Sequence, residues 1–349
     1  MALNLPLPTS VCILRLSAIG DVCNALAAVQ SIQRHYPDCA ITWVIGKVEH
    51  SLLKGLPGIR FVVFDKKQGW RAYRQLKADL AGETFDYLLH MQVALRANLA
   101  SLFINAHHKV GFDKARAKEL HSLFMSHRIA PRQGEHVLEG FMQFAEFIGV
   151  PKQPPRWDMS IAPDDQAWAR QQIGRSTKNI VICPAASNAE RNWLPQHYAA
   201  IADWVASQGY QVYICGANTE LEQRLAKAIE HHAQASCLNL VGKSNLKQLL
   251  ALIALADGVL APDTGPAHMA VAVGTPVVGL YAHSNPARTG PYAYPGLVVD
   301  VYHLLLNKRH NHVSSEVKWG FRLKGDDLMT HISVDKVKEK MQQVIGCKS

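Results

Sequence analysis

The sequence predicts an α/β protein of two domains, each built on a parallel sheet. Short apolar runs that suit buried strands alternate with amphipathic helical patterns along the chain. A proline-rich stretch at 150–155 interrupts this alternation, and the same pattern starts again after it. With 349 residues, the chain is long enough for two such domains with separate cores.

The order of strands and helices follows from the period of the apolar residues. The first half is expected to contain strands near 11–16, 41–45, 61–64, 87–91 and 109–111, and helices near 21–35, 70–80 and 136–148. The second half is expected to contain strands near 180–183, 212–215, 238–241, 258–261 and 276–280, and helices near 197–207, 220–232, 246–255 and 334–345.

Composition indicates a soluble, cytoplasmic protein. Hydrophobic residues make up 48% of the chain and charged residues 19%, and no apolar run reaches the length of a membrane span. The N-terminus lacks the basic and continuously apolar segments of a signal peptide. Cys12, Cys183 and Cys215 fall inside strand patterns, where cysteine is a small buried hydrophobe, so we expect reduced thiols.

The net charge of +9 is concentrated in the first half. Between Lys47 and Arg132 there are 15 Lys and Arg residues against 7 Asp and Glu residues. This excess indicates an anionic partner, such as a lipid or glycolipid at a membrane surface, or else a solvated basic face. Nucleic acid is not expected, because no zinc-finger spacing and no aromatic-interleaved basic motif is present.

Asp21 closes the run Ser17-Ala-Ile-Gly-Asp, which lies between the first predicted strand and the first helix. It is therefore placed at the carboxyl end of a strand, where open α/β sheets bind ligands. A carboxylate at this position can take a proton from a substrate hydroxyl. The alternative is that Asp21 only caps the helix.

A second turn of this kind begins at Asp263, after the predicted strand at 258–261. Thr264 and Gly265 then open a helix whose backbone N–H groups form a candidate anion site. Asp263, like Asp21, has a capping role as its alternative.

The segments 14–21, 263–270 and 274–281 resemble the ADP-heptose:lipopolysaccharide heptosyltransferases, glycosyltransferase family 9, in motif, order and spacing. The segments 13–26 and 90–96 are closest to the heptosyltransferase I-like branch, which adds the first heptose to the inner-core Kdo sugar. The resemblance implies a GT-B-like fold with two Rossmann-like domains facing across a cleft. Residues 1–155 would bind the acceptor and 156–332 the nucleotide-sugar donor, with a C-terminal helix at about 333–346 packed on the first domain.

For the donor, the resemblance implies that Arg191 binds the diphosphate, a position where many members carry lysine. Asp263, Thr264 and Gly265 would form the adjoining turn, and His268 would border the donor, although a lone histidine is more often structural. The loop carrying Arg191 follows the strand at 180–183, and a guanidinium suits phosphate. Trp193 is expected to be a packing residue.

For the acceptor, the resemblance places binding loops around the helix predicted at 70–80. Arg71 and Arg74 fall three residues apart on one helical face, with Lys66, Lys67 and Lys77 nearby, and Arg96 follows the fourth strand. We expect Arg71, Arg74 and Arg96 to bind acceptor phosphates and carboxylates. Ser17 is a candidate for orienting the acceptor or Asp21, although a serine in a turn needs no such role.

No cofactor or metal is expected. The 17 histidines form no metal-ligand spacing, and phosphate-binding P-loop and dinucleotide motifs are missing from the sequence. The resemblance implies direct displacement with inversion and no metal, with Asp21 as general base. The expected protein is a peripheral enzyme on the cytoplasmic face of the inner membrane, acting on ADP-heptose and anionic Kdo-lipid A. The alternatives are a later heptosyltransferase, another sugar transferase of the family, or a non-catalytic binder of anionic glycolipids.

Overall fold

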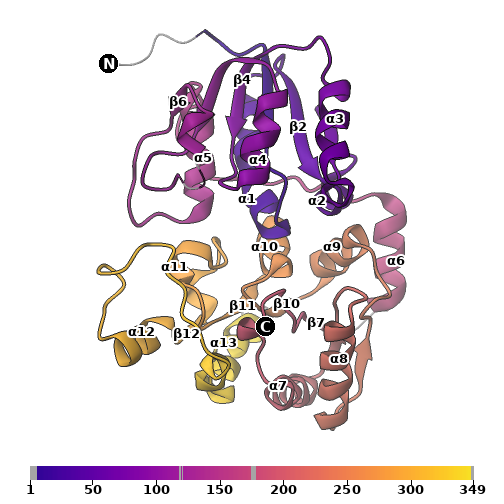
Figure 1. Ribbon diagram of the computed structural model, residues 1–349. Coiled ribbons are helices and arrows are strands. Elements are labelled where there is room, and N and C mark those ends of the chain that lie inside the picture. Colours follow the sequence, from indigo (N-terminus) through magenta and orange to yellow (C-terminus); the bar gives the residue numbers. More distant parts are fainter. Residues whose placement is uncertain (1–5, 118, 120, 174–177, 347–349) are drawn as a thin grey trace. The chain divides into compact units, whose positions relative to one another are not determined.

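The computed structural model describes residues 6–117, 119, 121–173 and 178–346. The chain divides into two compact units, Met1–Ser160 and Ile161–Ser349. Each unit is a parallel sheet covered by helices on both faces (Figure 1). In the described part of the chain, no helix combines the length and apolar character that crossing a bilayer needs.

The first sheet has six parallel strands in the order β3-β2-β1-β4-β5-β6. The five predicted strands of this half are present, and the sheet also contains a short edge strand that was not predicted. The bounds are β1 Ser10–Leu14, β2 Ala40–Gly46, β3 Ile59–Phe64, β4 Phe85–His90, β5 Ala106–Gly111 and β6 His127–Arg128.

The helices of the first unit are α1 Ile19–His35, α2 Lys47–Leu53, α3 Trp70–Asp79, α4 Leu95–Ala100 and α5 Val137–Phe147. Helices α1 and α5 pack against each other. Helices α3 and α4 bury Tyr73, Leu76 and Ala97 in a core that also holds Cys12 and Leu14 of β1. Successive side chains of a strand point to opposite faces of the sheet, and helices cover both faces. Both sets of side chains are therefore buried, which is why the strands are apolar throughout.

The second sheet also has six parallel strands, in the order β12-β11-β10-β7-β8-β9. The bounds are β7 Lys178–Ile182, β8 Tyr210–Ile214, β9 Cys237–Asn239, β10 Gly258–Pro262, β11 Val277–Tyr281 and β12 Val298–Asp300. Counted along each unit, the two sheets therefore share one strand order. In both, the first strand lies between the second and the fourth.

The helices of the second unit are α6 Pro163–Ile173, α7 Pro195–Ser207, α8 Glu220–His232, α9 Leu246–Leu255, α10 Gly265–Ala272, α11 Pro286–Thr289, α12 Tyr302–His310 and α13 Val334–Gly346. Its main core joins α7, α12 and α13 to one face of the sheet. Trp193 is buried in this core and donates a hydrogen bond through Nε1 to the Ile332 carbonyl oxygen (3.0 Å), which confirms its packing role.

The C-terminal helix does not follow the expectation that it packs on the first domain. Val337 and Met341 of α13 are fully buried in the core of the second unit, and Val344 contacts the strand position Gly258. The Tyr210 hydroxyl donates to the Ile345 carbonyl oxygen (3.4 Å). The apolar stripe of α13 is thus satisfied against α7, β11 and β12 of its own unit.

The segment expected as a linker belongs to the first unit beyond residue 155. Gln30 of α1 donates through Nε2 to the Asp158 carbonyl oxygen (2.7 Å) and accepts from the Asp158 N–H (2.9 Å). Trp157 Nε1 donates to the Cys23 carbonyl oxygen (2.8 Å). These bonds hold the extended segment along α1, so the boundary falls after Ser160 and not after residue 155.

A neutral histidine is buried beneath the carboxyl edge of the first sheet. His121 donates from Nδ1 to Asn98 Oδ1 (2.9 Å), and its Nε2 accepts from the Phe112 N–H (3.2 Å). The acceptor role of Nε2 places the ring proton on Nδ1. Burial, reinforced by the Arg128 charge, lowers the pKa of His121 from 6.5 to about 4.

This histidine makes the stability of the first unit depend on pH. Between pH 6.5 and about pH 4, the unfolded chain binds a proton at His121 that the folded chain does not, so acidification favours unfolding. We expect about 3 kcal/mol of folding free energy to be lost over this range from this group. Urea unfolding at neutral pH and at about pH 4.5 should show a smaller loss in His121→Gln than in the wild type. The exposed His107→Gln should behave as wild type; an equal loss in all three proteins would contradict the assignment.

Candidate functional site

Asp21 lies where β1 passes into α1, at the carboxyl edge of the first sheet. The N-cap of α1 is Ala18, so Asp21 is the third helical residue and not the cap. Its Oδ2 accepts a hydrogen bond from the Ala18 N–H (3.3 Å), and its side chain is 35% exposed. Asp21 therefore caps the helix from the third position, as in a capping box, and the capping alternative stands beside the catalytic one. The carboxylate also remains open to a ligand.

Arg15 holds the Asp21 carboxylate from the last position before the turn. One guanidinium nitrogen forms an ion pair with Asp21 Oδ2. The other donates to the Met91 carbonyl oxygen (2.6 Å), and the group lies over the Phe141 ring, 5.2 Å from its centroid. With only 11% of its side chain exposed, Arg15 is rigidly placed and fixes the position of the carboxylate.

Gln92 holds the turn from the neighbouring strand. It follows β4, which pairs with β1, and its Oε1 accepts from the Leu16 N–H (2.7 Å). Its Nε2 donates to Ser17 Oγ (3.3 Å). One amide side chain therefore holds both the backbone of Leu16 and the hydroxyl of Ser17 in the turn that leads to Asp21.

Glu49 is a second carboxylate at this edge, which the sequence analysis did not identify. Burial raises its pKa, the positive charges of Lys66 and Arg15 oppose this, and the nearby Asp21 charge adds to it. A side chain at Gly46 would meet the Leu16 carbonyl oxygen at 2.2 Å and Glu49 Oε2 at 2.5 Å. The close passage of β2 over the β1 turn therefore requires glycine at position 46.

The three predicted acceptor arginines lie on the segments that follow β3 and β4. Arg71 and Arg74 are exposed in the first turns of α3, and Arg96 is exposed at the start of α4. The Tyr73 hydroxyl donates to the Arg96 carbonyl oxygen (3.4 Å), which joins the two segments. The first unit thus gathers basic side chains on the sheet edge that carries Asp21.

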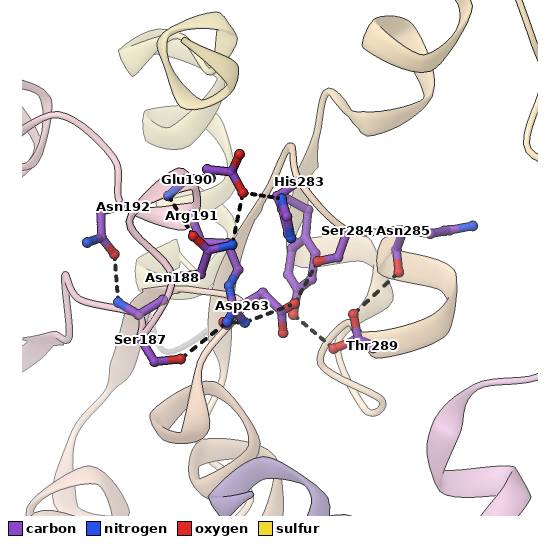
Figure 2. Close-up of polar contacts among 12 residues, drawn as sticks. Ser187, Asn188, Glu190, Arg191, Asn192, Asp263, His283, Ser284, Asn285 and Thr289 are labelled. Atoms are coloured by element: carbon purple, nitrogen blue, oxygen red, sulfur yellow. Dashed lines mark hydrogen bonds and ion pairs between the residues drawn. The ribbon is translucent and has the colours of Figure 1, made fainter. Parts of the chain in front are cut away.

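Arg191 ends a 3-10 turn, Ala189–Arg191, that follows β7 in the second unit. Its guanidinium donates to the Asp263 carbonyl oxygen (2.7 Å), and the same nitrogen lies 3.5 Å from Asp263 Oδ2. A second nitrogen donates to Ser187 Oγ (3.4 Å). Figure 2 shows Arg191 between the loop after β7 and the loop after β10. Its Nε has no hydrogen-bond partner among the described residues.

Asp263 joins three loops of the second sheet. Besides contacting Arg191, its Oδ2 accepts from the Ser284 hydroxyl (2.6 Å) beyond β11, as Figure 2 shows. Thr264 is the N-cap of α10, but Pro266 has no N–H, and the Ala267 N–H donates to the Thr264 carbonyl oxygen (3.2 Å). Gly265 is the first residue of the helix, and the helix start therefore offers fewer free N–H donors than its sequence predicts. His268 is buried in α10.

Glu190 anchors the loop that presents Arg191. Its carboxylate accepts from the Gly325 N–H (3.0 Å) and from Asn188 Nδ2 (3.0 Å), and these bonds lower its pKa. His283 Nδ1 lies 3.5 Å away. Burial lowers the pKa of His283, so this contact is not an ion pair at neutral pH. The loop is fixed before any ligand arrives, and Arg191 needs little reorganisation to bind an anion.

Several residues of these clusters were not identified from the sequence as part of the site, among them Arg15, Glu49, Gln92, Glu190 and Ser284. Their long-range partners are brought near by the order of the strands in the sheet and not by closeness in the sequence. Arg15 carried a signal, since it directly follows β1 and lies four residues before the start of α1. Gln92 and Ser284 carried none.

Two Rossmann-like units of identical strand order define a GT-B-type glycosyltransferase fold. The family model of glycosyltransferase family 9 (heptosyltransferase) matches residues 73–318. The chain belongs to this family and is a glycosyltransferase.

The similarity to relatives extends over nearly the whole chain. It is 45% identical to the lipopolysaccharide core heptosyltransferase OpsX of Haemophilus influenzae, over 97% of each chain. Two solved structures share the fold: a family 9 glycosyltransferase from Veillonella parvula, with 19% identity, TM-score 0.79 and coverage of 100% and 99%, and E. coli heptosyltransferase WaaC with ADP, with 18% identity, TM-score 0.75 and coverage of 96% and 99%.

Proposed function

We propose that this protein transfers heptose from ADP-heptose to the Kdo inner core of lipopolysaccharide, with inversion at the anomeric carbon and without a metal. The observation that carries the proposal is the ion-paired, accessible Asp21 at the carboxyl edge of a family 9 fold. The 45% identity to a lipopolysaccharide core heptosyltransferase supports the choice of sugar and acceptor.

The second unit would hold the donor. Arg191, fixed by the Glu190 anchor, would bind the diphosphate, and the Asp263–Gly265 turn with His268 would line the same site. A related solved structure contains ADP, which supports a nucleotide diphosphate here. As the bond from the anomeric carbon to the diphosphate breaks, negative charge grows on the leaving phosphate. The guanidinium and the Gly265 N–H supply the positive potential that stabilises it.

The first unit would hold the acceptor, with Asp21 as general base. The Kdo hydroxyl attacks the anomeric carbon from the side opposite the diphosphate, and its proton passes to an Asp21 oxygen. Arg15 keeps that oxygen aimed, and Ser17 orients the hydroxyl or the carboxylate. Arg71, Arg74 and Arg96 bind acceptor phosphates and carboxylates. The protein would act as a peripheral enzyme on the cytoplasmic face of the inner membrane.

The assay that tests this function measures ADP release from ADP-heptose with and without Kdo-lipid A. We expect release that depends on the acceptor and produces heptosylated lipid. Release only with an acceptor that already carries one heptose would make the protein a later heptosyltransferase. Donor and acceptor binding with no turnover would make it a glycolipid binder.

Asp21→Asn should lower turnover by roughly 10²–10⁴ while the fold survives, because the amide keeps its size but cannot accept the proton. Donor affinity should change little. The exposed Asp38→Asn, at the amino end of β2, serves as the matched control. Turnover near that of the wild type in Asp21→Asn would show that this residue is structural.

Arg191→Ala should weaken ADP binding by about 1.5–3 kcal/mol, the size of a charge-assisted hydrogen bond. Arg191→Lys should recover part of this loss, because the charge stays while the planar fork is lost. Calorimetric titration measures both, with the exposed Arg170→Ala of α6 as control. Unchanged ADP affinity in Arg191→Ala would show that Arg191 does not bind the diphosphate.

Reversing Arg71 and Arg74 to Glu should raise the acceptor KM and leave ADP affinity intact. The contacts are exposed, so they are screened over about 10 Å at 0.1 M salt, and the wild-type acceptor KM should rise with ionic strength. The matched control is the double reversal of Arg224 and Lys227, which have the same spacing on α8. If the acceptor KM changes neither with salt nor on reversal of Arg71 and Arg74, the basic residues form only a solvated surface and do not bind the acceptor.

A further inference from the structure

Three large apolar side chains are exposed on α3, α4 and the 3-10 turn that follows α4 in the first unit. Trp70 is 60% exposed, Leu95 49% and Leu102 56%. Tyr73 links them: its ring lies 4.9 Å from the Trp70 ring and 5.9 Å from the ring of Phe103, the neighbour of Leu102. Its hydroxyl bonds the carbonyl oxygen next to Leu95 (3.4 Å). Trp70 and the chain neighbours of Leu95 and Leu102 therefore contact one buried tyrosine.

Five exposed cations lie on the same segments, in the turn before α3, on α3 and at the start of α4: Lys66, Lys67, Arg71, Arg74 and Arg96. None of the ion pairs found among the described residues involves any of them. The nearby Asp65 carboxylate is already engaged by Lys47 (3.2 Å) and by the Lys67 N–H (3.0 Å). We call the three apolar and five basic residues the α3–α4 patch; its helices cover one face of the first sheet (Figure 1).

We propose that the α3–α4 patch docks on an anionic phospholipid surface, with Trp70 inserted at the headgroup level and Leu95 and Leu102 reaching the acyl boundary. Tryptophan suits this depth because its ring is apolar while its N–H stays hydrated. Five cations face two nearby carboxylates, Asp65 and Glu119, of which Glu119 accepts from the Leu95 N–H. This excess of positive charge and the scattered apolar side chains match a fluid anionic interface. A folded protein partner would instead require a contiguous apolar surface.

The proposal rests on the proposed function, because it explains how the proposed enzyme reaches a lipid-linked acceptor. Helix α3 begins after β3 and α4 after β4, at the sheet edge that carries Asp21. Docking through these helices brings that edge to the membrane where the acceptor sugar lies. Trp70, Leu95 and Leu102 thus act on the lipid surface itself, whereas the arginines also contact the acceptor.

The first test measures partitioning of the full chain onto vesicles of phosphatidylethanolamine and phosphatidylglycerol that contain no acceptor. Trp70→Ala should weaken partitioning about tenfold, and the double change of Leu95 and Leu102 to Ser by a similar factor. Each basic residue should contribute about fivefold at low salt. Leu304→Ser on α12, which removes a side chain that is 61% exposed in the second unit, should have no effect.

The second test separates docking from catalysis. With a water-soluble acceptor stripped of its acyl chains, Trp70→Ala should keep the wild-type kcat/KM, whereas with the acceptor embedded in vesicles its kcat/KM should fall about tenfold. Wild-type partitioning in Trp70→Ala and in the double leucine variant would overturn the proposal, and so would an equal loss on both acceptors. If the wild-type protein transfers no heptose to any acceptor but Trp70 still controls partitioning, the proposed function fails and the docking surface stands.

Discussion

A parallel sheet sends every strand-to-helix turn to the same edge, and the rest of this structure depends on that constraint. In both units the first strand lies between the second and the fourth, so the connections diverge at the first and fourth strands. The turns after β1 and β4 meet there in the first unit, and those after β7 and β10 meet in the second. This is why Gln92 bonds the turn that carries Asp21, and why Arg191 bonds Asp263.

The two clusters use the same physical device, an arginine held against a carboxylate by bonds to the backbone. Arg15 bonds the Met91 carbonyl oxygen and Arg191 the Asp263 carbonyl oxygen, so neither guanidinium is free to swing. Half-buried pairs of this kind contribute little net stability once desolvation is counted. In the proposed reaction their value would lie in preorganisation, because both groups are in place before the ligand binds.

The sequence predicts the strands and the two aspartates well, because both depend on local pattern. All ten predicted strands are present, and Asp21 and Asp263 follow β1 and β10 as expected. The short helices α2 and α4 were not predicted, since six or seven residues give too little periodicity. The pairing of Arg15 with Met91, and of Glu190 with Gly325, spans 76 and 135 residues and is decided by topology. The placement of α13 was wrong because it came from the family resemblance, whereas its apolar stripe fits its own unit.

The central claim is that Asp21 activates an acceptor hydroxyl for direct attack on the donor's anomeric carbon. NMR of the heptosylated product, formed from ADP-heptose and Kdo-lipid A, tests it most directly. Direct attack predicts one new glycosidic bond whose anomeric configuration is opposite to that of the donor, with no free heptose. A bond that retains the donor configuration would require a covalent intermediate or a same-face mechanism, and it would contradict the role given to Asp21.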